Sequence, residues 1–512
     1  MGDSSSHAMA GVAGHGVTWT PRRYLVLLLA FLALHGVLAA VLPLSGDEAY
    51  FWDCARHPSW STFDQPPLVI WGVIPFRLVL GDTALAARAP AIVANALLGL
   101  FLLPLARRLG GGAREAAWAY LVLHGVPLFF LGSFYNATDT VMIAAYVAAT
   151  WAAVALAQGQ RRAWWGFGAA VGIGFLGKFP VVLVLMALIP ALARREVRAQ
   201  LRTATPYLAA LLSALLTLPV WIWAAQHDWV NFTFQLKERH DVGALTLVHL
   251  GAFLGASALL ASPPLFVALS LAWWRGWRRR EPGWAALLVA VASPFALFGL
   301  ISLWESVGGH WGAPGIVLGV VALALTRPRP RALVASGVAF GVAVALAVVM
   351  LALAVDRMPW SKLPLSDASR ARVLDALAPA IGNNEIVAEI ERRLAPGELV
   401  ASESYTDVHM LTFLSHSRLH VRLANVNQGL HGLESLYWYR PEELANRDFF
   451  FVTERVGLTE RLEAIFAHVH EEAPIVVMRA GHVVRHVRVL RCTRLLQPTP
   501  AFTRLGAAHP VS

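Results

Sequence analysis

Charged side chains are scarce in this sequence, since Asp, Glu, Lys and Arg together make up 14% of its 512 residues. Soluble domains usually contain about 25% charged residues, so an ordinary soluble protein is excluded. The apolar share is 57%, and the mean hydropathy is +0.56. Apolar runs long enough to cross a hydrocarbon layer of about 30 Å recur along the chain. The sequence therefore predicts an α-helical polytopic membrane protein.

Cysteine is also scarce, and the two residues present, Cys54 and Cys492, exclude a framework of disulfide bonds. Both fall on the non-cytoplasmic side of the topology predicted below. A single bridge between them is therefore an open alternative.

The net charge of +10 comes from basic residues that cluster between apolar runs, while alternate connections carry almost no Lys or Arg. The clusters lie at 22–23, 107–114, 161–162, 194–202, 275–280 and 327–331. This alternation is the positive-inside pattern of membrane proteins, so the charge reports topology and no nucleic-acid partner is expected. It predicts a cytoplasmic N-terminal tail at residues 1–22.

With the basic clusters in the cytoplasm, the apolar runs predict about eleven transmembrane helices within a domain of residues 23–355. The predicted spans are 24–42, 87–106, 115–132, 139–157, 163–178, 180–193, 206–225, 247–273, 284–304, 311–326 and 332–355. The first run is longer than the apolar region of a signal peptide, which favours an uncleaved helix. Residues 163–193 lie between two basic clusters, so they predict a short hairpin broken at Pro180.

Residues 356–512 have a different composition, with frequent charges and short apolar runs at 448–454, 475–479 and 486–492. Such runs, mixed with helix-like stretches, predict a soluble α/β domain. Eleven spans from a cytoplasmic N-terminus place this domain on the outer, periplasmic side. The two long outer connections, 43–86 and 226–246, are predicted to be the catalytic loops.

Polar side chains gather in five segments, all on the predicted outer face. They are Asp47 and Glu48 in GDEAYFWDCARHPSWSTFDQPP (46–67), Asn136 and Asp139 in GSFYNATD (132–139), Lys178, the group at 224–240, and Glu305 with His310. Each has a plain structural reading: a helix end at the water boundary, an N-cap at Asp139, or a lysine that snorkels to the interface. Acids, bases and cations that converge at one membrane face nevertheless indicate an active site.

In this order and spacing, the motifs DEAYFWDCARHP, FDQPPL, GSFYNATD, FLGKFP, PVWIWAAQHDWVNFTFQ and GHWGAP resemble the bacterial branch of the protein-mannosyltransferase-like GT-C glycosyltransferases. This branch includes aminoarabinose and galacturonosyl lipid A transferases. The resemblance covers roughly residues 20–320. It implies a GT-C fold in the inner membrane and transfer of a sugar from a polyprenyl-phosphate donor. One departure is Gln65, which stands where members usually carry His, so that imidazole is absent or is replaced by His57.

The resemblance also implies roles for residues. Asp47 is expected to be the general base of an inverting displacement, with Glu48 and Asp139 as further catalytic carboxylates. Lys178 is expected to bind the donor phosphate, with Lys237 and Arg239 in reserve. Predicted substrate contacts are Tyr50, His57, Asp64, Gln65, Asn136, Gln226, His227 and His310, with Tyr405, Asn427 and Trp438 from the soluble domain. No cofactor is certain, and a divalent metal ion held by Glu48, Asp139 and His227 is the alternative.

The expected partners are the lipid-linked donor, membrane lipids, and lipid A or another envelope glycan as acceptor. A secreted protein acceptor, as in protein mannosyltransferases, stays open. A transporter of lipid-linked sugars is the alternative from a different class. It would place charges near the bilayer midplane and show two related halves.

Overall fold

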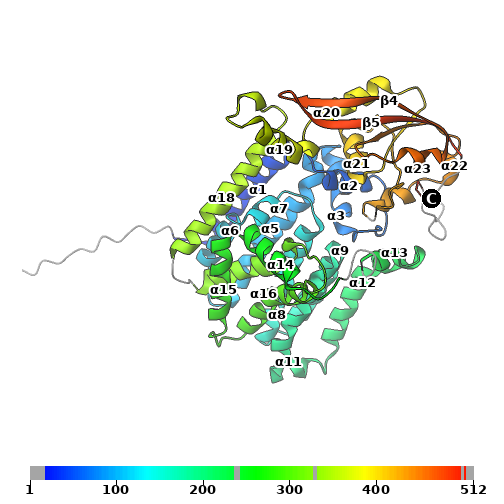
Figure 1. The fold of residues 1–512 in the computed structure, drawn as a ribbon. Helices are drawn as coiled ribbons and strands as arrows, with labels where there is room; N and C mark the ends of the chain where they lie inside the picture. The colour runs from blue at the N-terminus through cyan, green and yellow to red at the C-terminus, as the bar shows by residue number, and fades with distance from the viewer. Residues whose placement is uncertain (1–17, 236–242, 327–330, 430, 497–500, 503–512) are drawn as a thin grey trace, which may run out of the picture.

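The computed structural model describes residues 18–235, 243–326, 331–429, 431–496 and 501–502 (Figure 1). A layer of membrane helices forms the larger part, and a sheet domain covers one end of it. The predicted architecture, a helical membrane protein with a C-terminal α/β domain, is confirmed.

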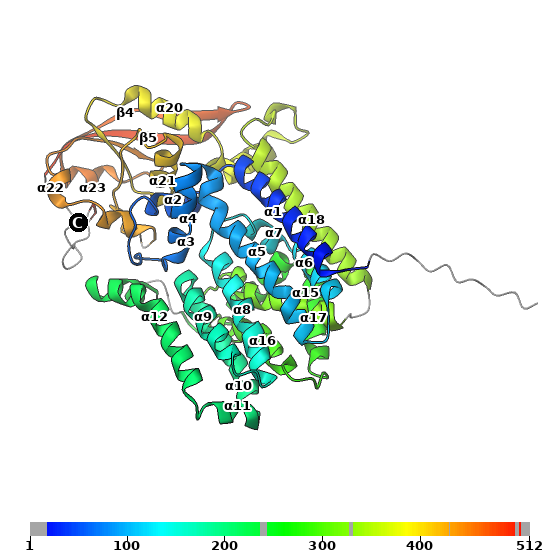
Figure 2. The ribbon, with the colours of Figure 1, turned by 180° about the vertical axis from the view of Figure 1, so that it is seen from behind.

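Seven helices within the described ranges are long and apolar enough to cross a membrane. They are α1 (Pro21–Val41), α5 (Ala84–Arg108), α8 (Thr138–Ala157), α12 (Ala204–Gln226), α16 (Trp284–Ile301), α17 (Ala313–Thr326, extended by the 3₁₀ turn Gly309–Gly312) and α18 (Arg331–Ala354). Figures 1 and 2 both show α1 and α18 side by side. A bent helix pair raises the number to eight, so the predicted count of about eleven is not confirmed.

Most of the other predicted spans are shorter or broken helices. They are α6 (Ala113–Leu123), α7 (Pro127–Gly132), α9 (Ala163–Gly177), the 3₁₀ helix Phe179–Ala187, α10 (Leu188–Leu192), α14 (Leu247–Ala261) and α15 (Pro263–Gly276). The predicted span 247–273 is bent by 102° at Ser262, whose φ is 75°. Pro263 begins the second helix because proline fits the first helical position but interrupts an established helix.

The predicted hairpin at 163–193 breaks at Lys178, two residues before Pro180. There α9 ends and the backbone becomes extended, with φ −162° and ψ 136°. Pro180 has no N–H to bond the Leu176 carbonyl, and its ring would clash with that carbonyl in a continuous helix, so α9 ends at Gly177 and a separate 3₁₀ helix begins at Phe179. The break leaves the backbone of Lys178 non-helical at the end of α9.

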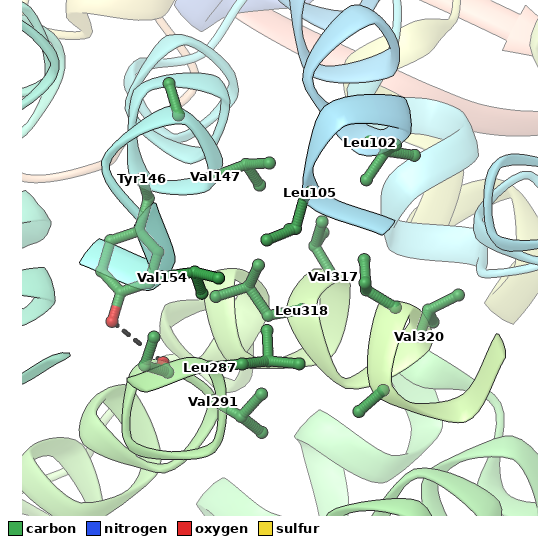
Figure 3. Packing of buried hydrophobic residues seen from close by; sticks show 14 of the residues in the cluster. Leu102, Leu105, Tyr146, Val147, Val154, Leu287, Val291, Val317, Leu318 and Val320 are labelled. Atoms are coloured by element: carbon green, nitrogen blue, oxygen red, sulfur yellow. Dashed lines mark hydrogen bonds between the residues drawn. The ribbon is translucent and has the colours of Figure 1, made fainter. Parts of the chain in front are cut away.

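The membrane core lies between α5, α8, α16 and α17, where apolar side chains interdigitate (Figure 3). The Tyr146 hydroxyl is hydrogen-bonded there to the Ala290 carbonyl at 3.0 Å and to the Ser293 hydroxyl at 2.8 Å. Many alanines on α8 are fully buried. Small residues let helices approach closely, which is how membrane helices gain packing energy without a hydrophobic driving force.

The inner ends of these helices are joined by polar contacts at the end of the molecule away from the sheet. Arg108 donates to Gln158 at 2.9 Å, and Arg161 donates to Thr205 at 2.8 Å. The short helix α11 (Arg195–Gln200) lies at this end (Figure 1). The basic clusters around Arg108, Arg161 and α11 are thus on the side opposite the sheet domain.

The outer ends carry the first long connection, which folds into α2 (Gly46–Cys54), α3 (Leu68–Trp71) and α4 (Val73–Leu80). The second long connection begins with the one-turn helix α13 (Val230–Thr233). Helix α2 packs on α21 (Tyr405–Leu414) of the sheet domain. At this contact, the buried His409 ring nitrogen lies 2.8 Å from the Asp53 carboxylate.

The C-terminal domain is one five-stranded sheet with the strand order β2-β1-β3-β5-β4. Its elements are α19 (Asp367–Leu377), α20 (Asn383–Arg393), β1 (Leu399–Ser402), β2 (Val421–Leu423), α22 (Pro441–Leu444), β3 (Phe449–Thr453), α23 (Thr459–Glu463), β4 (Phe466–Arg479) and β5 (His482–Leu495), with 3₁₀ turns at Trp360–Lys362, Ala378–Ala380 and Leu433–Tyr437. Strand β1 is parallel to both of its neighbours, whereas β5 is antiparallel to β3 and β4.

Both faces of the sheet centre are covered, so the run FFFVT in β3 is apolar on each face. Cys492 lies in the core on one face, while Cys54 lies in α2. Both cysteines are free and buried, so the alternative of a Cys54–Cys492 bridge is wrong.

Candidate active site

A cavity of about 790 Å³ lies where the outer helix ends meet the sheet domain. Apolar side chains of α7, α14, α17 and α18 form part of its lining. Its polar lining groups are Asp47, Tyr50, Asp64, Gln65, Asn95, Ser133, Tyr135, Thr138, Asp139, Thr140, Lys178, His310, Tyr405 and His431. The cavity therefore offers both polar groups and apolar surface to a ligand.

The local sequence SGDE places the first acid of the site. Ser45 is the N-cap of α2, and its hydroxyl accepts a hydrogen bond from the Glu48 N–H while the Glu48 carboxylate accepts one from the Ser45 N–H. This reciprocal capping box engages the Glu48 carboxylate in capping the helix. Asp47, in the same first turn, stays exposed and lines the cavity. The positive end of the helix dipole favours a carboxylate at this position.

Glu48 is fully buried and points away from the cavity into a network with Arg88 of α5. The Arg88 Nε and Nη2 atoms donate to its two oxygens, each at 2.7 Å. The Asn136 N–H donates to Glu48 Oε1 at 3.2 Å. With the Ser45 N–H, four donors surround this carboxylate, so no acceptor site is left for a substrate proton. The prediction of Glu48 as a catalytic group is therefore not supported; it joins α1, α2 and α5.

Two tyrosyl hydroxyls hold Asp47. Tyr405 donates to Asp47 Oδ1 at 2.7 Å, and Tyr135 donates to Oδ2 at 3.5 Å. Burial, followed by the charge of the neighbouring Asp47, raises the pKa of Tyr405 above its ordinary value. The phenol therefore stays protonated and acts as a donor at neutral pH.

The second acid, Asp139, is ion-paired with Lys178 at 2.7 Å, and both line the cavity. Asp139 lies in the first turn of α8 after Ala137, so it is not the N-cap. Lys178 stands at the break between α9 and the following 3₁₀ helix, and its ammonium is 6.0 Å from the Trp311 ring centroid. The Lys178 side chain is paired with Asp139 beside the cavity, which favours a role in the site over snorkelling to the interface.

Asp64 joins the outer loop to the sheet domain. Its Oδ1 accepts from the Tyr50 hydroxyl at 2.7 Å, and its Oδ2 accepts from the Gly432 N–H at 3.0 Å. Nearby, Glu434 accepts from the Phe63 N–H at 2.8 Å. Burial raises the pKa of both carboxyls, and that of Glu434 stands well above its ordinary value.

These buried carboxyls predict that docking of the two parts weakens as pH rises. The pKa of these carboxyls is higher in the folded protein than in the unfolded chain, so the unfolded chain loses the protons first as the pH rises. The free energy of unfolding therefore falls as the pH rises from about 4 toward the folded pKa. We expect Glu434→Gln to reduce the fall in melting temperature between pH 5 and pH 8, measured in detergent. The exposed Glu442→Gln is the control. An unchanged pH dependence in Glu434→Gln would contradict the assignment.

Several predicted contacts lie outside the cavity. His57 stacks on Trp438 at a centroid distance of 4.0 Å, and Gln226 is exposed at the end of α12. Asn136 is buried and donates to the Val69 carbonyl at 3.3 Å. Asn427 accepts from the Gly429 N–H within its own turn at 3.3 Å. The predictions for Lys237 and Arg239 lie outside the described residues.

The three proposed metal ligands do not come together. His227 lies beside α12, with its Nδ1 2.8 Å from the Trp223 carbonyl and its ring stacked on Trp223. Glu48 is enclosed by Arg88, and Asp139 is paired with Lys178. Within the described ranges, no three or more His, Cys, Asp or Glu side chains are arranged to hold a metal ion.

Three residues of the site were missed by sequence reasoning. Tyr135 lies inside the GSFYNATD motif, and Arg88 is a charge inside a predicted span, so both carried a readable signal. His431 lines the cavity from the sheet domain, and no local pattern marks it.

Comparison with known proteins agrees with this geometry. Residues 64–223 match the family described as dolichyl-phosphate-mannose-protein mannosyltransferase. The fold is similar to apo ArnT from Cupriavidus metallidurans (TM-score 0.63, 16% identity, 92% of this chain and 98% of that chain). It is also similar to the same protein bound to undecaprenyl phosphate (TM-score 0.61, 16% identity, 95% of this chain and 100% of that chain). No curated relative matches the chain.

The predicted resemblance to protein-mannosyltransferase-like GT-C transferases is thereby confirmed. The family match and the fold together support a multi-pass membrane glycosyltransferase.

Proposed function

We propose that this protein transfers a sugar from a polyprenyl phosphate to an envelope acceptor at the outer face of the inner membrane. The observation that carries the proposal is a single cavity that is lined by apolar side chains of the membrane helices and also by Asp47 and the Asp139–Lys178 pair. An amphipathic donor needs this combination, because its tail must stay in hydrocarbon while its phosphate needs a cation.

Lys178 is proposed to bind the donor phosphate. An ammonium has three N–H donors, and Asp139 accepts one of them, which leaves two for phosphate oxygens. When the bond between sugar and phosphate breaks, the departing polyprenyl phosphate gains charge, and a fixed cation beside it lowers the barrier. Asp139 holds the ammonium in place.

Asp47 is proposed to be the general base. It is exposed in the cavity, and its carboxylate takes the proton of the acceptor hydroxyl while the acceptor oxygen attacks the anomeric carbon. A nearby carboxylate also stabilises the oxocarbenium character of the transition state. A single displacement of this kind inverts the anomeric centre. Tyr50, Gln65 and His310, which also line the cavity, are proposed substrate contacts.

The acceptor is proposed to be lipid A or another envelope glycan. The domain of residues 356–512 lies over the outer mouth of the cavity and would stand in the periplasm, where it can select the acceptor. The ionised lining groups lie at one face of the membrane part and are not distributed around its midplane, which favours transfer over transport.

The donor half of the proposal is tested by lipid binding. We expect Lys178→Ala to weaken binding of undecaprenyl phosphate by about 10- to 100-fold, the value of hydrogen bonds to a charged group. Binding of undecaprenol, which lacks the phosphate, should not change. Lys178→Arg should keep much of the affinity, and the distant Lys362→Ala is the control. Equal loss for both lipids, or no loss, would contradict the assignment of Lys178.

A further inference from the structure

Tyr405 reaches the site from the sheet domain. It is the first residue of α21, 358 positions along the chain from Asp47, yet its hydroxyl donates to Asp47 Oδ1 at 2.7 Å. The membrane part provides the acid, and the soluble part provides its closest hydrogen-bond donor.

Close packing fixes the Tyr405 ring. A Cβ at Gly432, where φ is +68°, would lie 2.1 Å from the Tyr405 Cγ atom, so the backbone rests against the ring. On another side, Tyr50 meets the ring edge-on at a centroid distance of 5.6 Å. A ring enclosed in this way has one rotamer, and its hydroxyl therefore has one position.

The start of α21 also touches the start of α2. A Cβ at Gly46 would lie 2.5 Å from the Cβ atom of Thr406. Glycine at position 46 allows this approach directly before Asp47. The two helix starts are therefore in direct contact, and the docked sheet domain helps to fix the position of Asp47.

The geometry leaves room for a substrate. A carboxylate has about four acceptor sites, and Tyr405 and Tyr135 occupy one on each oxygen of Asp47. The Tyr135 hydroxyl also accepts from Ser45 at 3.2 Å, which fixes the direction of its own proton. The remaining lone pairs of Asp47 can accept the proton of an acceptor hydroxyl.

We propose that Tyr405 is a positioning residue for the transfer reaction: it orients the Asp47 carboxylate, so that the base is complete only when the sheet domain is docked. This inference rests on the proposed function. It predicts that the soluble domain acts on the chemical step as well as on the choice of acceptor.

The test is Tyr405→Phe in the full-length protein, since phenylalanine keeps the ring packing and removes only the hydroxyl. We expect kcat to fall about 10- to 100-fold, the value of one hydrogen bond to a charged group, with KM for the lipid-linked sugar nearly unchanged. Tyr439→Phe, which packs on Arg422 outside the cavity, should leave both unchanged.

The outcomes separate the two claims. If Tyr405→Phe keeps the wild-type kcat, the positioning role is wrong while the transferase stands. If KM for the lipid-linked sugar rises and kcat does not fall, Tyr405 acts on donor binding alone and the proposal is also overturned. If wild-type protein transfers no sugar from any polyprenyl-phosphate donor, the proposed function itself fails.

Discussion

Replacing Asp47 with Asn is expected to lower the rate of sugar transfer by about 10²- to 10⁴-fold, the usual contribution of a general base. Asparagine has nearly the same shape, and its carbonyl oxygen can still accept the Tyr405 hydrogen bond seen at 2.7 Å. It cannot accept the proton of an acceptor hydroxyl at neutral pH. The fold and the affinity for polyprenyl phosphate should therefore be preserved while turnover is lost.

The measurement is release of polyprenyl phosphate from a lipid-linked sugar by purified protein, with binding of polyprenyl phosphate measured in parallel. Asp82→Asn is the matched control, because Asp82 accepts from Arg77 at the same face and does not line the cavity. Wild-type turnover in Asp47→Asn would remove Asp47 as the base. Loss of both turnover and binding would show that Asp47 shapes the donor site instead.

The second large effect is expected on stability, from replacement of Arg88 by Met. Arg88 and Glu48 are almost completely buried, and the arginine also donates to the Leu42 and Pro43 carbonyls, each at 2.7 Å, at the end of α1. Removing it leaves a buried carboxylate without its cation. Breaking one partner of a buried ion pair costs about 3–5 kcal/mol.

This expectation is tested by unfolding the purified protein in detergent with denaturant. The Glu48→Gln/Arg88→Met double variant removes both charges and should recover much of the lost stability, since it no longer buries an unpaired ion. Arg77→Met breaks a partly exposed pair and should cost about 0–1 kcal/mol. If Arg88→Met is no less stable than Arg77→Met, the structural role of this pair is wrong.

The membrane class, the C-terminal α/β domain and the acids of the outer mouth could be predicted from sequence because their signals are local. Long apolar runs predict spans by length alone, and the SGDE pattern at 45–48 also contained a capping box that assigns Glu48 to helix structure. The bend at Ser262 had a local signal as well, in the double proline that follows it. The catalytic role predicted for Glu48 and the unbroken span predicted across Ser262 therefore came from reading local patterns incompletely.

The contacts between the two parts could not be predicted in this way. Tyr405 meets Asp47, and the Gly432 N–H meets Asp64, across more than 350 positions. Hydrophobic period and turn chemistry describe neighbours along the chain, so they do not show which loop of one domain docks on another. His57 is a further example, since it stacks on Trp438 of the sheet domain, whereas His227 stacks on Trp223 of its own segment.

The most direct test of the account is mass spectrometry of envelope lipids and polyprenyl-phosphate sugars from cells that lack the gene, complemented with wild type or with Asp47→Asn. The account predicts that deletion removes one sugar from an envelope glycolipid, that the matching lipid-linked sugar accumulates, and that only wild type restores the product. Restoration by Asp47→Asn, or a deletion that leaves every glycolipid and carrier unchanged, would contradict a transferase with this active site.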